Sequence, residues 1–345
     1  MSEQKDLHTT PRDPRDSTTW VSIDQTVPAI PAIRANTPSL QEHAQTSLPK
    51  QTGQVRRSRR VKNSQELLSP PVRVGATIIL AIFVLIPIAY AVLLSVTPDA
   101  LIGGDALIPT QWAFDNYVQM WNTVSLAQGL FNSLLISIVA SLIAVVVAVG
   151  AGYVLSRFKF RGRLVYLYSL IGLQTVPSVM LLLPLFVLFA SIQAALHLRL
   201  VGTYQAVIIT YLTFALPFAT WLMLSYFESI PIDLEEAALV DGATRLRALW
   251  EVIVPITLPG IVVALVFSFL TGWNDVLFAS VLTSPETRTV AVQLQTFSSA
   301  QEGGALPLYG QLMGAAIVSA LPVVVLYMVF QRYLVGGLTA GGVKG

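Results

Sequence analysis

Six long apolar stretches dominate the pattern of the chain after residue 70. Each holds roughly 20 residues or more, which is enough for a helix to cross the hydrocarbon core of a bilayer. They cover about Val74–Val96, Leu130–Leu155, Leu164–Ile192, Tyr204–Tyr226, Ile256–Leu282 and Leu308–Val335. The pattern predicts an all-α polytopic membrane protein whose membrane domain, residues 71–345, contains six transmembrane helices.

Residues 1–70 have a different character. They are rich in Pro, Ser, Thr, Gln and charged residues and show no sustained apolar period, so we interpret them as a disordered tail. The tail ends in a basic cluster made of Arg56, Arg57, Arg59, Arg60 and Lys62. Such a cluster can bind nucleic acid, or it can lie beside the membrane and keep the tail in the cytoplasm. The second interpretation is favoured, because no aromatic residues alternate with the basic ones.

The basic residues of the membrane domain indicate its orientation. Nine of the eleven Lys and Arg residues beyond residue 70 precede span one, follow span two or span four, or close the chain at the C-terminal end of span six. The loops on the other side hold only Arg199 and Arg288. Cytoplasmic loops carry the excess of basic residues in membrane proteins, so we expect both termini to be cytoplasmic.

Composition narrows the class of protein further. Hydrophobic residues make up 54% of the 345 residues and charged residues only 12%, about half the charge of a soluble domain. The absence of cysteine excludes disulfides, thiolate catalysis and Cys-ligated zinc. His8, His43 and His197 are too far apart in the sequence to make a metal-ligand spacing. We therefore expect no bound metal or cofactor.

Small residues and prolines distinguish some spans from the others. Span two carries Ala140, Ala144, Ala148 and Gly152, and such residues allow helices to approach closely, so this span is expected inside the bundle. Most of the spans contain proline, which frees backbone carbonyl groups from the helical hydrogen bonds. The prolines are either packing kinks or bends around a substrate path.

A few polar residues within the spans are candidates for a translocation pathway. Asp275 is the single acid inside a predicted span and follows Trp273 and Asn274. A charge at the membrane centre costs roughly 2.5–3.5 kcal/mol, which disfavours a lipid-facing position. Asp275 is therefore expected either in water near the outer end or on the pathway, with Asn274 and Trp273 beside it. Gln174 and Gln311 are the other candidates, and hydrogen bonds between helices are the alternative for both.

The longest ordered cytoplasmic loop, residues 228–255, predicts a short helix, a turn and a second helix. Asp233 can cap the first helix, and Glu236 three residues later can complete a capping box. Gly242 suits a left-handed turn, and Thr244 can cap the second helix. The small residues Ala237 and Ala238 would allow a partner to come close to the backbone of the first helix.

This loop resembles the EAA loop of binding-protein-dependent ABC transporter permeases. The residues that carry the resemblance are Glu236, Ala237, Ala238, Gly242, Val252, Val254 and Pro255. The family usually has Ile and Leu at the positions of Val252 and Val254, which is a mild departure. The run Gly272–Asp275 and the C-terminal run Gly337–Gly345 are similar to the maltose-type subunit of the carbohydrate uptake group. The resemblance covers about residues 70–345.

The resemblance implies a type I ABC importer permease in the bacterial inner membrane. Two permease subunits, usually different, would form the pathway for a sugar such as maltose or trehalose. A sugar-binding protein would deliver the sugar from outside, and a dimer of ATPase subunits would receive the EAA loops. Glu236, Ala237, Ala238, Gly242 and Pro255 would then couple this chain to the ATPase.

The resemblance also implies that this chain is not an enzyme. It contains no G-x-x-x-x-G-K-[ST] run for a nucleotide, so ATP would be used by the partner alone. Its partners would be these proteins, the sugar and membrane lipid, with no nucleic acid. Two alternatives are a permease of the same fold for amino acids or peptides, and a membrane scaffold that transports nothing.

Overall fold

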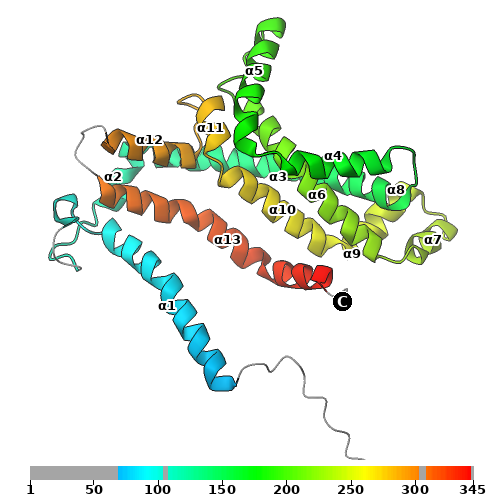
Figure 1. The fold of residues 1–345 in the computed structure, drawn as a ribbon, viewed down its shortest axis with the longest axis horizontal. Coiled ribbons are helices and arrows are strands. Elements are labelled where there is room, and N and C mark those ends of the chain that lie inside the picture. The colour runs from blue at the N-terminus through cyan, green and yellow to red at the C-terminus, as the bar shows by residue number, and fades with distance from the viewer. Residues whose placement is uncertain (1–68, 104–107, 303–307, 343–345) are drawn as a thin grey trace, which may run out of the picture. The chain divides into compact units, whose positions relative to one another are not determined.

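The computed structural model of the chain describes residues 69–103, 108–302 and 308–342 (Figure 1). These residues form helices and connecting loops, with one isolated β-bridge between Gly202 and Thr283. The expected all-α polytopic fold is confirmed. The predicted tail of residues 1–70 and its basic cluster lie outside the described residues, apart from Ser69 and Pro70.

Three helices form the centre of the bundle: α3 (Leu126–Arg157), α6 (Tyr204–Ser229) and α10 (Leu258–Trp273). They lie side by side in Figure 1. The small residues of α3 face its neighbours, since Ala140, Ala144, Ala148 and Gly152 are all buried. A Cβ atom on Gly152 would lie 2.9 Å from the Cβ of Met223 on α6. The prediction that span two is buried in the bundle is therefore confirmed.

Two long helices, α1 (Pro70–Ser95) and α13 (Tyr309–Gly342), pack beside each other. The C-terminal end of α1 is held by α2 (Asn116–Thr123), a short helix that the apolar pattern did not predict. The side chain of Asn116 donates to the carbonyl oxygen of Ser95 at 3.0 Å, and the backbone N–H of Gly310 donates to Asp99 at 2.8 Å. Most of α1 is exposed and apolar, as expected for a helix in lipid.

The stretch expected as one span at Leu164–Ile192 is two helices. They are α4 (Arg163–Thr175) and α5 (Ser178–Leu196), and the break falls at Val176 and Pro177. A residue before proline is pushed out of the helical region, and Val176 has an extended conformation with ψ of 123°. Of the two, α5 is long and apolar enough to cross a membrane, so the expected single span was wrong.

The stretch expected at Ile256–Leu282 is also interrupted. After α10 the chain leaves the helix at Asn274 and starts α11 (Leu277–Leu282). Before α10, the segment Arg245–Ile256 meets it at a bend of 79°. Pro259 lies just after this bend and lacks the N–H that would continue the helical hydrogen bonds. The described residues thus contain five candidate spans, or six when the bent pair counts as one.

At the end of the bundle opposite the loop of residues 228–255, hydrogen bonds to backbone carbonyl groups hold the chain after α11 against α3. The Asn132 side chain of α3 donates to the carbonyl oxygens of Glu286 and Arg288 at 3.0 and 2.8 Å. The hydroxyl of Tyr204 donates to Asn132 at 2.9 Å, which ties α6 into the same network. The helix α12 (Val290–Glu302), also not predicted, follows directly.

Candidate coupling site and transport pathway

The loop of residues 228–255 folds into a helix, a turn and a second helix, as expected. The first helix, α7, spans Asp233–Val240, and it is followed by α8 (Arg245–Ala248), a π-helical turn (Leu249–Ile253) and α9 (Val254–Ile256). The predicted capping box is wrong. Asp233 lies inside the first turn rather than before it, and no side chain caps the helix.

The turn between the two helices confirms the expectation for Gly242. Its φ is +90°, in the left-handed region that favours glycine. Thr244 caps α8 as predicted, since its hydroxyl oxygen accepts from the backbone N–H of Arg247 at 3.3 Å. Arg247 in turn forms an exposed ion pair with Glu251 at 2.9 Å. The turn and the cap together determine how α7 is aimed relative to α8.

A small hollow of ≈ 300 Å³ lies beside this turn. Most of its wall consists of small or short side chains, so the backbone is accessible there. The lining residues are Ala238, Asp241, Gly242, Ala243, Arg247, Ala248, Glu251 and Val252. Such a hollow is suited to receive a protruding side chain of another protein.

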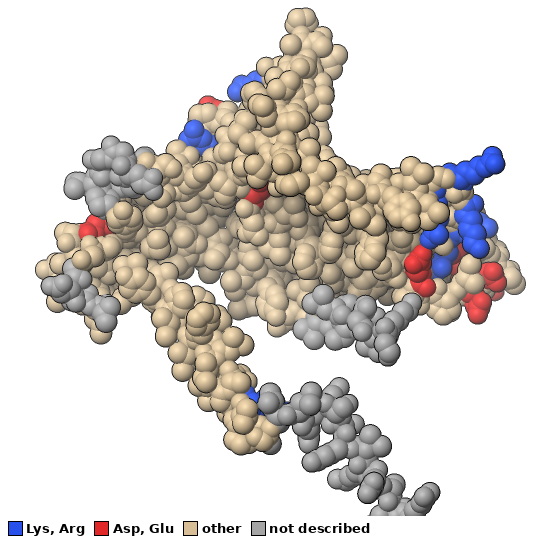
Figure 2. All heavy atoms as spheres, in the orientation of Figure 1, with Lys and Arg blue, Asp and Glu red and all other residues tan. Residues whose placement is uncertain are grey.

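Three of the residues that carry the family resemblance, Ala238, Gly242 and Val252, line this hollow, and the others lie in the same loop. Glu236 and Ala237 are exposed, Ala238 is half-buried, and Pro255 is exposed in the following helix. Figure 2 shows that basic and acidic side chains gather at the end of the bundle that bears α7 and α8, while the long helices are mostly uncharged. The loop therefore offers a charged, accessible surface at one end of an apolar body.

The sequence analysis missed the residue that fastens α7 to the bundle. Glu235 is 3% exposed, and its carboxylate accepts a 2.6 Å hydrogen bond from the hydroxyl of Tyr153 on α3. Arg157, one turn further along α3, places its Nε 2.9 Å from the other carboxylate oxygen. This contact is a close ion pair, although it lacks the alignment of a hydrogen bond. The i, i+4 spacing of Tyr153 and Arg157 at the end of an apolar span was the available signal.

The candidate pathway residues Trp273, Asn274 and Asp275 lie at the break between α10 and α11. Trp273 is buried and stacks on Phe269, with ring centroids 5.4 Å apart, whereas Asn274 is exposed. Asp275 is half-buried and accepts hydrogen bonds from the hydroxyl of Tyr211 at 3.0 Å and the backbone N–H of Ala279 at 2.9 Å. The carboxylate thus joins α6 to the first turn of α11.

The two glutamines lie apart from this break. Gln174 is exposed near the end of α4. Gln311 is buried near the start of α13 and donates to the side chain of Gln119 on α2 at 2.9 Å. The structure therefore does not bring the five candidate pathway residues together around one cavity.

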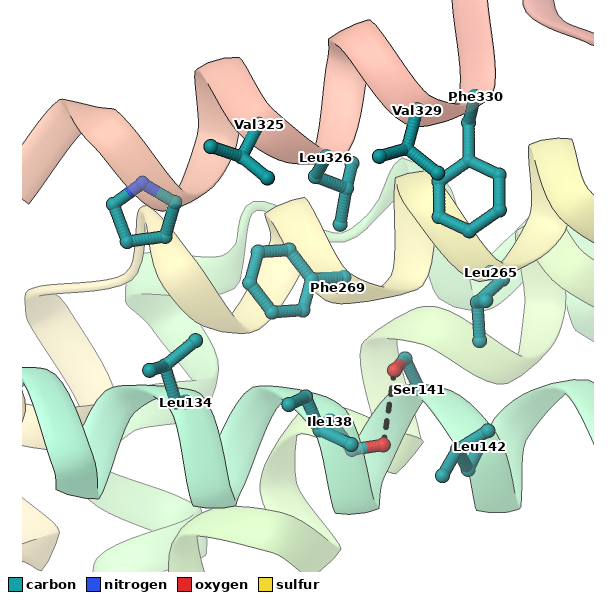
Figure 3. Close-up of a pocket in the computed structure, with 11 residues that line it drawn as sticks. Leu134, Ile138, Ser141, Leu142, Leu265, Phe269, Val325, Leu326, Val329 and Phe330 are labelled. Carbon is teal, nitrogen blue, oxygen red and sulfur yellow. Dashed lines mark hydrogen bonds between the residues drawn. The ribbon is translucent and has the colours of Figure 1, made fainter.

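An apolar groove of ≈ 370 Å³ runs between α3, α10 and α13 (Figure 3). Its walls are formed mostly by aliphatic residues and by Phe269 and Phe330. Ser141 is its polar member, but the Ser141 hydroxyl donates to the carbonyl oxygen of Ile138 within the same helix at 3.0 Å. None of the five candidate pathway residues lines the groove, although Trp273 contacts it through Phe269.

Comparison with known proteins decides the family. Residues 144–339 match the family described as "Binding-protein-dependent transport system inner membrane component", which is more than half of the chain. The chain belongs to this family. With its several apolar helices, the protein is a multi-pass permease of the inner membrane.

Individual relatives match most of this permease. It is 32% identical to the trehalose/maltose transport system permease protein MalG of Thermococcus litoralis, covering 81% of this chain and 99% of that protein. It is 36% identical to the trehalose transport system permease protein SugB of Mycobacterium tuberculosis, covering 76% and 93%. Among solved structures, it is similar to a chain of a bacterial ABC transporter involved in import of the acidic polysaccharide alginate. That match has a TM-score of 0.61 at 25% identity and covers 77% of this permease and 98% of that chain.

Proposed function

We propose that this permease is one of the two membrane subunits of an ABC importer that carries a di- or oligosaccharide into the cell. The observation that carries the substrate class is the agreement among relatives that match along most of their length. The names of three of them specify trehalose or maltose, trehalose, and diacetylchitobiose. The chain itself would supply no catalysis, because it has no phosphate-binding loop for ATP.

The loop of residues 228–255 is the proposed contact with the ATPase dimer. Its support is geometric: a short exposed helix, a glycine turn and a small hollow lie together at the charged end of the bundle. Glu236 and Ala237 would contact the ATPase directly, since both are exposed. The side bias of Lys and Arg supports a cytoplasmic position for this loop and for both termini.

The opposite end would face the sugar-binding protein. There the segment Thr283–Thr289 is held to α3 and α6 by Asn132 and Tyr204, so it forms a rigid surface rather than a loose loop. Polar side chains on this side, among them Arg199, Glu286 and Arg288, offer hydrogen-bonding groups to a partner.

Reconstitution tests the proposal. The permease is placed in lipid vesicles with its second permease subunit and its ATPase, and uptake of labelled solutes is measured with the binding protein present. Trehalose, maltose and diacetylchitobiose are compared with an amino acid and a dipeptide. Uptake of one of the sugars that requires both ATP and this chain is expected. Uptake of the amino acid or dipeptide alone, or ATP-independent uptake, would contradict the proposal.

A further inference from the structure

The helix α7 is attached to the bundle in an unusual way. Of its eight residues, Glu235 is the buried one, while the apolar residues Leu234 and Val240 are exposed. An amphipathic helix normally docks through an apolar face. In α7 the carboxylate of Glu235 makes the buried contact with the bundle. No apolar residue of α7 belongs to the four apolar core clusters found among the described residues.

Two partners of Glu235 come from the last turns of α3, and the exposed Arg245 of α8 lies 4.0 Å from the same carboxylate. Tyr153 donates its hydroxyl hydrogen at 2.6 Å, and Arg157 pairs at 2.9 Å with its side chain only 7% exposed. Tyr153 is itself fixed by edge-to-face contacts with Phe158 and Phe227. The guanidinium of Arg157 also donates to the carbonyl oxygen of Ile230 at 3.4 Å. The cluster therefore joins α3, the end of α6 and α7.

A buried ion pair contributes little net stability, but it strongly resists separation. Its charges have lost their hydration, so pulling one partner away leaves the other unpaired in a poorly solvated place. An apolar contact can slide with small loss, whereas a buried charge must stay beside its partner, and the hydrogen bond from Tyr153 fixes the position of the Glu235 carboxylate. Motion imposed on α7 is therefore passed to the end of α3 instead of being absorbed at the contact.

We infer that Tyr153, Arg157 and Glu235 form the mechanical link through which α7 moves α3 and the membrane part of the permease. These three are positioning residues. The helix α3 is continuous over 32 residues, and its side chains Leu134, Ile138 and Leu142 line the apolar groove. A displacement at Arg157 thus reaches the groove through one stiff element. The inference rests on the proposed function, because it assumes that an ATPase moves α7.

The test uses the complete transporter in lipid vesicles and measures sugar taken up per ATP hydrolysed. Three variants are compared with the wild type: Glu235→Gln, Arg157→Met and the double variant Glu235→Leu/Arg157→Met. The double variant removes both charges together and so keeps the fold even where a single change leaves a buried charge unpaired. The control is Arg163→Gln, which breaks the Arg163–Glu228 ion pair of 2.9 Å at the same end of the bundle and lies on α4, outside the loop of residues 228–255.

All three link variants are expected to keep the ATPase bound and ATP hydrolysis near the wild-type rate. Their sugar uptake per ATP falls about tenfold, and the double variant loses no more than either single one, because the residues act as one unit. The control keeps wild-type uptake. A double variant that restores wild-type coupling would show that the cluster only stabilises the fold, and would overturn the inference. Losses that add up in the double variant would overturn it too.

The wild-type complex separates this outcome from failure of the proposed function. When the wild-type transporter takes up sugar and the variants do so equally well, the link is refuted and the proposed function stands. When the wild-type transporter takes up no sugar with ATP and binding protein present, the proposed function is refuted before any variant is considered.

Discussion

At the scale of single residues, Gly242 shows a purely conformational requirement. A Cβ atom added there would meet nothing within 4 Å, so space is not the reason for glycine. Its φ of +90° is the reason, because residues with a side chain pay roughly 1–2 kcal/mol for left-handed backbone. The turn that aims α7 thus depends on backbone geometry alone.

Gly242→Val is therefore expected to abolish sugar uptake and to weaken co-purification of the ATPase, while the amount of permease in the membrane stays near normal. A β-branched residue is poorly suited to positive φ. The matched control is Gly242→Asn, since asparagine tolerates this region and should keep most of the uptake. If Gly242→Asn loses as much sugar uptake as Gly242→Val, the position excludes any side chain, and the left-handed backbone is not the reason for glycine.

Gly260 shows the opposite requirement, for space. A Cβ atom added to Gly260 would lie 2.5 Å from the ring of Tyr226. The ring of Tyr226 on α6 therefore packs directly against the backbone of α10 at Gly260. Gly260→Ala is expected to lower the melting temperature and the amount of permease in the membrane. Gly150→Ala on α3 is the control, because a Cβ there meets nothing within 4 Å. Thermal unfolding in detergent gives the melting temperatures of both variants, and the amount of each in the membrane fraction is measured separately. A Gly260→Ala protein with the wild-type melting temperature would contradict this packing.

At the scale of elements, the two interrupted spans have different causes. The break between α4 and α5 follows from Pro177, a local cause visible in the sequence. The break between α10 and α11 contains no proline, and the hydrogen bonds of Asp275 to Tyr211 and Ala279 hold it instead. The second break therefore depends on a contact between α6 and the chain after α10.

Removal of this contact is expected to loosen α11. Asp275→Ala deletes the acceptor for three donors, the hydroxyl of Tyr211 and the backbone N–H groups of Phe278 and Ala279. Each unsatisfied buried group costs about 1–3 kcal/mol. Tyr211→Phe removes one of these three hydrogen bonds and should destabilise less than Asp275→Ala does. Ser280→Ala is the control on the same short helix, where the exposed hydroxyl bonds only to the carbonyl oxygen of Leu277. We expect the melting temperature to be highest for Ser280→Ala, lower for Tyr211→Phe and lowest for Asp275→Ala. A lower melting temperature for Tyr211→Phe than for Asp275→Ala would contradict this account.

At the scale of the whole molecule, the distribution of basic residues predicts the orientation in the membrane. Reporter domains fused at the C-terminus and inserted in the loop between Asp99 and Asp115 should report opposite sides, with the C-terminus cytoplasmic. A reporter inserted after Val240, an exposed residue of α7, should agree with the C-terminus. Signals from the same side at Asp99–Asp115 and the C-terminus would contradict the orientation.

The helical fold and most of the spans could be predicted from the sequence alone. Hydrophobic length and the placement of Lys and Arg are properties of each segment by itself, and the bilayer acts on each segment separately. The short helices α2 and α12 could not be found in this way, because they are held by contacts such as Asn116 with Ser95 and not by an apolar period.

The sequence by itself determined the helix–turn–helix form of the loop of residues 228–255, with its turn at Gly242 and its cap at Thr244. Turns and caps depend on neighbours within a few residues, so they can be read from the sequence. Only the tertiary structure decided which acid of α7 is buried. Asp233 and Glu236 were the expected capping residues, yet Glu235 is the one that meets Tyr153, which lies 82 positions earlier in the chain. A one-residue shift on a helix turns a side chain by about 100°, so the choice depends on where α3 ends in space.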